Sequence, residues 1–466
     1  MDRFEGYLSP FSWRYGSEAM RGLWSEAHKL HTWRRLWVAL AQVEHEAGMV
    51  SAEQLDALRQ HQDDIDIVRS QAIEAEIQHD VMAEIRCFGE QAPAGAGILH
   101  LGATSSDIKD NALVLIQKDA LLLLKAKLLR LLDALAGQME KWANLPEVGF
   151  THLQPAEPTT LGYRLAIYAQ DLLTDLEQLC AVESRLKGKG FKGAVGTGAS
   201  FIQVLGAEWV EVFDRRLAEL LGIGFFPVTT QTYPRKQDYS VLSTLAGMGA
   251  SLHKLAFDLR ILQSPVIFEV SEPFGKKQVG SSAMPFKKNP INAEKMDSLA
   301  RLLAQYPRVA WDNAALSLLE RTLDDSANMR SVLPEAFLIS DELLETAVKI
   351  VSGLVVHEEQ IVRNFARFAP FASVEAVLMA IARKGGDRQV FHEVLREHSL
   401  RAWDTMLTEG QNPLQAWISA DSRVLAYLSA EELTQLFDPS TYLGWAPQRA
   451  REMAQEIKVV LGANGY

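Results

Sequence analysis

Cysteine is scarce in this chain: two residues, Cys87 and Cys180, occur among 466. They lie far apart, and neither has a cysteine or histidine partner at metal-ligand spacing. This pattern argues against a disulfide framework or a zinc knuckle and favours a reducing compartment. Glycine and proline are also few, at 30 and 17 residues, which excludes collagen-like and low-complexity architectures.

Positive charge is in deficit, since 47 Lys and Arg stand against 59 Asp and Glu and give a net charge of −12. General binding to nucleic acid or to an anionic membrane is therefore disfavoured, although a local cationic pocket for an anionic metabolite is not. The first five residues lack the basic start and apolar core of a signal peptide. The leucine-rich stretch 120–135 is interrupted by four charged residues and is no membrane span. We expect a soluble, cytoplasmic protein.

Helical periodicity dominates the remaining pattern. Apolar residues recur at spacings of three and four in segments 18–48, 112–141, 159–187, 240–265, 291–318 and 331–355. The best strand candidate, Thr229–Tyr233, is short. Without strands to position them, Gly193, Gly196 and Gly198 predict turns and not a dinucleotide-binding loop.

The length predicts about three domains at ~150 residues each. We place an N-terminal helical domain at 1–104, a central bundle of long helices at 105–357 and a smaller C-terminal helical domain at 358–466. The C-terminal part is expected to have shorter helices, separated by Gly385-Gly386 and Asn412-Pro413. The predicted fold is all-α, with a bundle whose apolar faces are shared between subunits.

The most unusual stretch, Gly280–Pro290, reads Gly-Ser-Ser-Ala-Met-Pro-Phe-Lys-Lys-Asn-Pro. Small hydroxyl residues beside glycine give a pliable loop with exposed N–H donors, and two lysines and an asparagine add donors suited to anions. Residue types alone equally allow a polar loop that caps a helix. Two histidines also stand outside helical faces: His152, in a proline-punctuated connection, and His79, followed by Asp80. Each is either structural or a proton carrier, whereas His28 and His31 are expected at the surface.

Two further segments combine charges and hydroxyls. Glu320–Arg330 carries Arg321 and Arg330 on either side of an Asp-Asp-Ser cluster; this pattern fits salt-bridged helix ends or a phosphate clamp. Thr104-Ser105-Ser106-Asp107, followed by Asp110-Asn111, is typical of a helix N-cap, whose free N–H groups also suit a carboxylate.

Taken together and in this order, the four motifs resemble the fumarase/aspartase superfamily, whose members eliminate fumarate from succinyl compounds. Within it they resemble the adenylosuccinate lyases, and the run Arg321–Asn328 resembles their animal-type branch. The resemblance extends from about residue 9 to the C-terminal helices. It implies cleavage of adenylosuccinate to AMP and fumarate, cleavage of succinyl-aminoimidazole carboxamide ribotide, no metal and no organic cofactor.

The resemblance also implies roles. Ser281 matches the base, acting as an alkoxide; His152 matches the general acid, oriented by Glu294; and His79 matches a second histidine near the substrate phosphate. Lys287 and Asn289 match groups that hold the substrate carboxylate and the carbanion. Nucleotide or succinyl contacts are implied for Arg14, Tyr15, Asp80, Thr104, Ser105, Thr151, Gln231, Arg321, Ser326 and Arg330. Lys295 and Met329 stand at two positions where the animal-type pattern has arginine. These two positions therefore bear on the preference between the two substrates.

Helix length gives an independent expectation. If 112–141 is one helix, its ends lie about 45 Å apart, and the connection 142–151 reaches ~33 Å at most. Antiparallel neighbours bring both helix ends to one site more easily, so we expect a homotetramer with sites built from several subunits, as the resemblance implies. The alternatives are another superfamily member, such as an argininosuccinate lyase, and a non-catalytic, crystallin-like structural protein.

Overall fold

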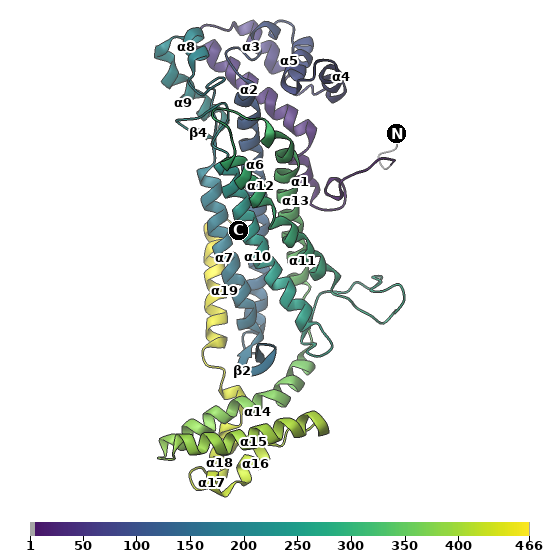
Figure 1. The fold of residues 1–466 in the computed structure, drawn as a ribbon, viewed down its shortest axis with the longest axis vertical. Helices are drawn as coiled ribbons and strands as arrows, with labels where there is room; N and C mark the ends of the chain where they lie inside the picture. The colour runs from purple at the N-terminus through teal and green to yellow at the C-terminus, as the bar shows by residue number, and fades with distance from the viewer. Residues whose placement is uncertain (1–4, 466) are drawn as a thin grey trace. The chain divides into compact units, whose positions relative to one another are not determined.

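The structure is a computed structural model that describes residues 5–465 (Figure 1). The chain forms two compact units. Unit 1 comprises the N-terminal residues to Leu128, Asp175–Ala250 and Ser298–Glu345, and unit 2 comprises Leu129–Thr174, Ser251–Asp297 and the residues from Thr346 onward. Each unit therefore takes three separate segments of the chain, joined through the long helices.

Long helices account for much of the chain. Those that contribute residues to both units are α6 (Ser105–Trp142), α7 (Leu161–Arg185), α10 (Lys236–Leu262), α11 (Ile291–Leu303) and α13 (Asp324–Ser352). Unit 1 adds α1 (Glu18–Leu23), α2 (Glu26–Glu46), α3 (Ala52–His61), α4 (Ile67–Ile77), α5 (Asp80–Gln91), α8 (Ala199–Leu205), α9 (Val210–Leu221) and α12 (Tyr306–Ala315). Unit 2 adds α14 (Glu358–Arg383), α15 (Arg388–Glu409), α16 (Leu414–Ala420), α17 (Ser422–Leu425), α18 (Ala430–Leu436) and α19 (Ala446–Ala463). The mostly helical fold predicted from the sequence is confirmed.

The helix boundaries follow local chemistry. Segment 112–141 lies inside the single helix α6, as predicted. The predicted helix 18–48 is divided because Ser25 acts as an N-cap, its hydroxyl accepting a hydrogen bond from the His28 N–H at 3.2 Å. The predicted helix 291–318 is two helices, since α11 ends at Leu303 and α12 begins at Tyr306. Two C-terminal helices, α14 and α15, are longer than expected, although Gly385 and Gly410 follow them as helix stops.

Short strands occur where the sequence did not indicate them. Strands β1 (Pro146–Thr151) and β2 (Gln154–Thr160) form an antiparallel hairpin in unit 2, with an irregularity between Val148 and Phe150. Two further pairs of two-residue strands occur among the described residues. β3 (Lys187–Gly188) pairs with β4 (Gly224–Phe225), and β5 (Val270–Ser271) pairs with β6 (Val355–Val356). The strand expected at Thr229–Tyr233 is wrong. This segment turns instead, because the Thr230 N–H bonds the Thr232 carbonyl and the Tyr233 N–H bonds Asp110.

Each unit has its own buried core. In unit 1, α2 buries Leu36, Trp37 and Leu40, which are at most 1% exposed. In unit 2, residues of α14–α18, among them Val377 and Leu414, form one apolar cluster. Within the described residues, α14 alone has the length and composition of a membrane span, with a mean hydropathy of 1.5 over 18 residues. Core helices of soluble proteins share these properties, and α14 packs against β1, β2 and α15.

Candidate active site

A cavity of about 710 Å³ lies in unit 1 among α2, α5, α6 and α13. Eight residues with predicted roles in substrate binding or catalysis line it: His79, Asp80, Thr104, Ser105, Gln231, Arg321, Ser326 and Arg330. They come from four separate parts of the sequence. The fold therefore gathers into one cavity residues of segments 104–107 and 320–330, the pair His79-Asp80 and Gln231, which the sequence analysis treated separately.

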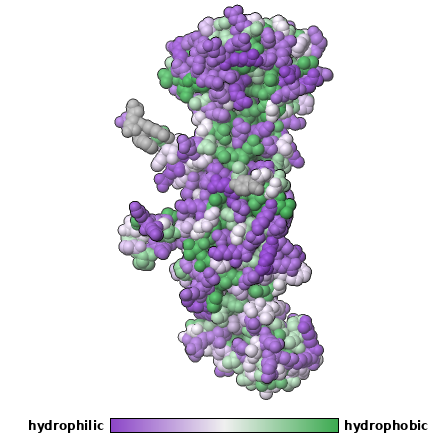
Figure 2. Space-filling model, turned by 180° about the vertical axis from the view of Figure 1, so that it is seen from behind, coloured by the Kyte–Doolittle hydropathy of each residue, from purple (hydrophilic) through white to green (hydrophobic). Residues whose placement is uncertain are grey.

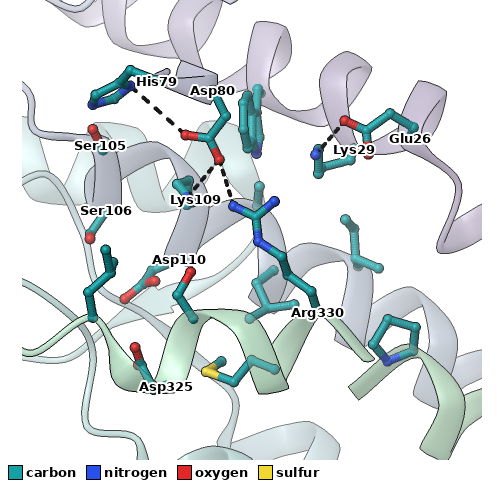
Figure 3. A pocket seen from close by; sticks show the side chains of 18 of the residues that line it. Glu26, Lys29, His79, Asp80, Ser105, Ser106, Lys109, Asp110, Asp325 and Arg330 are labelled. Atoms are coloured by element: carbon teal, nitrogen blue, oxygen red, sulfur yellow. Dashed lines mark hydrogen bonds and ion pairs between the residues drawn. The ribbon is translucent and has the colours of Figure 1, made fainter. Parts of the chain in front are cut away.

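Asp80 anchors one wall of this cavity (Figure 3). Its Oδ2 atom accepts hydrogen bonds from Lys109 Nζ at 2.8 Å and Arg330 Nη2 at 3.0 Å. Burial alone would raise the pKa of Asp80, but the hydrogen bond and charge of Lys109, with help from Arg330, outweigh it and lower the pKa to about 2. Asp80 is therefore a permanent anion at neutral pH.

The adjacent His79 is the N-cap of α5. Its Nδ1 atom accepts the Met82 N–H at 3.2 Å. An Nδ1 atom that accepts a hydrogen bond carries no proton, so the neutral ring has its proton on Nε2. The approach of Nδ1 to Asp80 Oδ1 at 3.9 Å is consequently no ion pair in this protonation state. His79 offers the cavity an N–H donor.

A second group of buried charges holds Arg321. Asp325 Oδ1 accepts from Arg321 Nη1 at 2.8 Å, and its Oδ2 accepts from Arg235 Nε at 2.8 Å. Arg235 also donates to Asp110 at 3.2 Å. The two readings of segment 320–330 are thus compatible, because Arg321 is ion-paired at a helix end and still lines the cavity.

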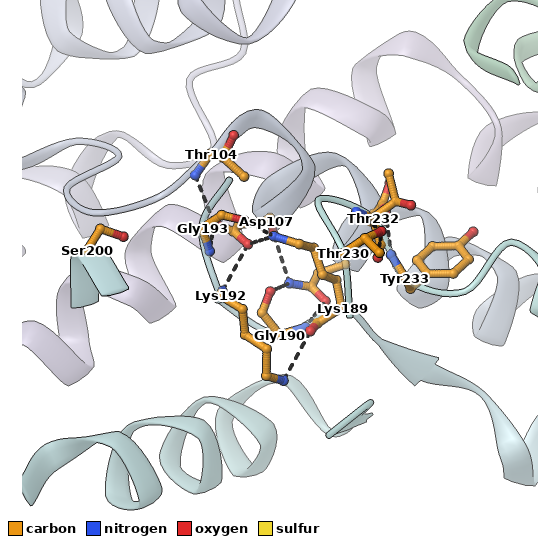
Figure 4. A network of polar contacts seen from close by, with 12 residues as sticks. Thr104, Asp107, Lys189, Gly190, Lys192, Gly193, Ser200, Thr230, Thr232 and Tyr233 are labelled. Carbon is orange, nitrogen blue, oxygen red and sulfur yellow. Dashed lines mark hydrogen bonds and ion pairs between the residues drawn. The ribbon is translucent and has the colours of Figure 1, made fainter. Parts of the chain in front are cut away.

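The N-terminus of α6 is fixed by Asp107 (Figure 4). Its carboxylate accepts from the N–H groups of Thr104, Lys192 and Gly193 at 2.8–3.1 Å and pairs with Lys189. Asp107 and Lys189 are both fully buried. The helix start predicted for this segment is confirmed, since α6 begins at Ser105. The Asp107 carboxylate holds the backbone that presents Thr104 and Ser105 to the cavity.

Arg14 and Tyr15 also belong to unit 1 but do not line this cavity. They follow the short 3-10 helix η1 (Pro10–Ser12), where the Tyr15 N–H bonds the Pro10 carbonyl at 3.1 Å. Arg14 is exposed, with its guanidinium 5.9 Å from the centre of the Tyr15 ring. Their predicted part in nucleotide binding stays a prediction.

The segment Gly280–Pro290 is a loop in unit 2, and it ends where α11 begins. Ser281 Oγ accepts hydrogen bonds from the N–H groups of Ala283 at 3.3 Å and Met284 at 3.0 Å. Amide donors on a hydroxyl oxygen favour its deprotonated form. Lys287 is exposed. Within the described residues, the hydrogen bonds to Ser281 Oγ come from these two backbone amides.

The same loop is closed into a ring at its base. Asn289 Nδ2 donates to the Gly280 carbonyl at 2.9 Å. A Cβ atom on Gly280 would lie 2.0 Å from the Lys287 carbonyl oxygen, which only glycine avoids. Beyond the ring, Glu272 accepts from the N–H groups of Asn292 and Ala293 at the start of α11. The loop is largely exposed, but hydrogen bonds at its base hold its two ends together.

His152 lies at the tip of the β1–β2 hairpin in unit 2. Thr151 pairs with Gln154, so His152 and Leu153 form the two-residue turn, and their φ angles are +53° and +59°. This left-handed pair is the geometry of a type I′ turn, which Asn-Gly adopts at low cost and most other residues do not. His152 is exposed, and strained backbone at such a residue is a feature of functional sites.

Glu294 is not paired with His152 in this structure. Its carboxylate lies 3.9 Å from Arg260, and no hydrogen bond joins it to His152 within the described residues. Thr151, like His152, is exposed on the hairpin. The predicted orienting role of Glu294 therefore has no direct contact here and stays a prediction.

Several cavity residues were not singled out from the sequence. Lys109 lies on α6, four residues after Ser105, so helical spacing places both on one face and could have indicated it. Asp110 and Asp325 were read as helix-end residues, although they bind Arg235 and Arg321. No sequence pattern indicated a role for Arg235, because it lies in an irregular segment before α10.

Two family models match this chain. Residues 5–303 match the family model described as Lyase, and residues 370–453 match the model described as Adenylosuccinate lyase C-terminus. For the described residues, no cluster of three or more His, Cys, Asp or Glu is placed to hold a metal ion. The two matches together span most of both units.

Relatives cover the chain almost completely. An adenylosuccinate lyase of Saccharomyces cerevisiae is 40% identical over 98% of this chain and 95% of its own length. One of Pyrococcus horikoshii is 35% identical over 97% of each chain. Among solved structures, a 3-carboxy-cis,cis-muconate lactonizing enzyme of Pseudomonas putida superposes with a TM-score of 0.85 at 28% identity, covering 96% of this chain and 99% of its own. This chain belongs to the adenylosuccinate lyase family of the fumarase-type lyases.

Proposed function

We propose that this chain cleaves adenylosuccinate to AMP and fumarate, and cleaves succinyl-aminoimidazole carboxamide ribotide in the same way. The observation that carries the proposal is the cavity of unit 1, where eight residues matched to nucleotide and succinyl positions meet. Full-length similarity to adenylosuccinate lyases supports it independently. Arg321 and Arg330 favour this activity over that of an argininosuccinate lyase, because argininosuccinate carries no phosphate for two arginines to bind.

The reaction is a β-elimination. A base removes a proton from the carbon beside one succinyl carboxylate, which becomes a doubly charged aci-carboxylate. The C–N bond then breaks, its electron pair goes to the nitrogen, and an acid protonates that nitrogen. Preorganised donors around the developing negative charge contribute several kcal/mol, roughly 3–4 for a single donor.

Ser281 is the base in this proposal. Its Oγ already accepts two backbone N–H groups, which stabilise an alkoxide and so lower the work of deprotonation. Lys287 and Asn289, on the same closed loop, hold the substrate carboxylate. His152, presented on its strained turn, protonates the departing nitrogen, with Glu294 as its orienting carboxylate and His79 near the phosphate.

Assembly completes the site. Of the proposed groups of unit 2, His152, Lys287 and Glu294 are exposed, and Ser281 and Asn289 are partly exposed. Large apolar side chains are exposed as well, among them Trp311, Leu316, Leu319, Phe257 and Phe286. Figure 2 shows apolar side chains, in green, at the surface among hydrophilic ones. The predicted bundle of long helices, with apolar faces shared between subunits, supports an oligomer, and we propose a cytoplasmic homotetramer with shared sites, built from the three domains at 1–104, 105–357 and 358–466. Sedimentation that finds an active monomer contradicts the tetramer.

The test of the activity is fumarate release by the purified full-length chain. Adenylosuccinate and argininosuccinate are supplied separately, and fumarate is measured by its ultraviolet absorbance. We expect release from adenylosuccinate alone. Release from argininosuccinate identifies the other lyase activity, and release from neither supports the non-catalytic, crystallin-like alternative.

A further inference from the structure

Lys109 is a cavity residue that neither the family resemblance nor the proposed mechanism uses. It lies in the first turns of α6, and its ammonium group is 2.8 Å from Asp80 Oδ2. The Lys109 side chain is 31% exposed and the Asp80 side chain 16% exposed. The lysine is thus neither a free surface charge nor a buried structural one.

Asp80 serves two cations with one oxygen. Arg330, from α13, donates to the same Oδ2 atom at 3.0 Å. Figure 3 shows Lys109 and Arg330 reaching Asp80 from two different helices, with His79 and Ser105 beside them. One carboxylate neutralises one of the two positive charges. The group formed by Lys109, Arg330 and Asp80 therefore keeps a net charge of about +1 and faces the cavity.

We propose that Lys109 is a further substrate-binding residue, which together with Arg330 receives the phosphate of the nucleotide. The inference rests on the proposed function, because it assumes a phosphorylated substrate in this cavity. When the phosphate enters, Lys109 and Arg330 redirect donors from Asp80 to the phosphate oxygens. Asp80 remains ionised and keeps both cations near the position that the phosphate occupies.

The choice of phosphate over a succinyl carboxylate follows from charge and donors. A phosphate monoester carries about −1.5 to −2 charges at pH 7 and three acceptor oxygens, so it competes better than a carboxylate against Asp80. Lysine binds phosphate as a point charge and arginine through its fork.

The experiment compares AMP with adenosine, which lacks the phosphate. Binding of each to the full-length protein is measured by calorimetry for wild type, Lys109→Met and the control Lys118→Met. Lys118 lies on the same helix and donates to the Gly222 carbonyl, away from this cavity. We expect Lys109→Met to weaken AMP binding by roughly 10- to 100-fold, as for a lost hydrogen bond between charged groups, and to leave adenosine binding unchanged. Lys118→Met should change neither.

A second pair of variants separates direct contact from simple neutralisation of Asp80. In an Asp80→Asn background, adding Lys109→Met should still weaken AMP binding by at least about fivefold. If the added change has no effect there, Lys109 only neutralises Asp80 and the inference is wrong. Equal weakening of AMP and adenosine also overturns it. Fumarate release by wild type is assayed in parallel, so a failure of the proposed activity is recognised separately.

Discussion

The binding cavity of unit 1 and the exposed loops of unit 2 are built in opposite ways. Around the cavity, Asp80, Asp107 and Asp325 each hold two or more donors, and most of these groups are buried. In unit 2, Ser281 lies on a largely exposed loop and His152 on an exposed turn. The residues proposed to bind the nucleotide are thus held by ion pairs and hydrogen bonds without a ligand, whereas the residues proposed for the chemistry lie on more exposed segments.

The sharpest way to test this contrast is to remove the proposed base. Ser281→Ala should lower kcat by at least 10²–10⁴-fold, the range of an acid–base step, because no other group occupies its place on the loop. Its thermal midpoint should match wild type, since Ser281 bonds only two amides of its own loop. Stopped-flow fumarate release and circular dichroism check both statements. Near-full activity removes Ser281 from this role.

The proposed acid needs a variant that respects its backbone. His152→Asn keeps a residue that tolerates φ near +53° while removing the imidazole. We expect kcat to fall about 10²–10⁴-fold with little change in KM. The matched control, Leu153→Asn, changes the other turn residue in the same way and should retain most activity. If both variants lose activity equally, the turn and not the imidazole is responsible.

Changes to the buried charges near the cavity should lower the free energy of unfolding. Asp107→Asn leaves Lys189 buried without a countercharge, and breaking a buried pair in this way costs about 3–5 kcal/mol. Burial lowers the pKa of Lys189 and the charge of Asp107 opposes this, so the variant also makes deprotonation of Lys189 easier. Urea unfolding measures the loss. An unchanged midpoint would show that the Asp107 network does not hold unit 1 together.

A smaller effect concerns Glu44, which is buried in α2 with neither carboxylate oxygen hydrogen-bonded within the described residues. Burial raises its pKa from 4.5 to about 8. Between these values the unfolded chain binds fewer protons than the folded one, so stability falls as pH rises, by up to ~1.4 kcal/mol per pH unit. Glu44→Gln should abolish this part of the slope between pH 5 and 8. Glu46→Gln, an exposed change on the same helix, should leave it intact.

The sequence predicted helices better than it predicted the irregular parts. The apolar spacing of α6 was clear because one face is buried along its length, as at Ile108, Leu121 and Leu135. The hairpin was missed because Pro155 and Pro158 argue against a strand and because its turn lacks the usual Asn-Gly. For Thr229–Tyr233, β-branched composition was overridden by the bond from the Tyr233 N–H to Asp110 on α6.

For the site, the family resemblance supplied the residues that were found together in the cavity, and physical pattern alone had left them open. What it did not supply are the partners. Asp110 and Asp325 read as ordinary helix-end charges until the structure shows which cation each one holds. Arg235 is 125 residues from Asp110 and 90 residues from Asp325, so local sequence carries no record of these two pairs. Arg321 and Asp325 are only four residues apart, and helical spacing could have indicated that pair.

The closed base of the Gly280–Asn289 loop has one more consequence. The Asn289 side chain bonds the Gly280 carbonyl. Ser281, Lys287 and Asn289 therefore lie on one loop that is closed by a hydrogen bond, and not on an open, flexible segment. The bond limits how far the two ends of the loop can separate, so a displacement of the loop carries all three residues with it. Solvent exposure of this loop consequently does not imply that Ser281, Lys287 and Asn289 are disordered relative to one another, and the closed loop can move as one unit.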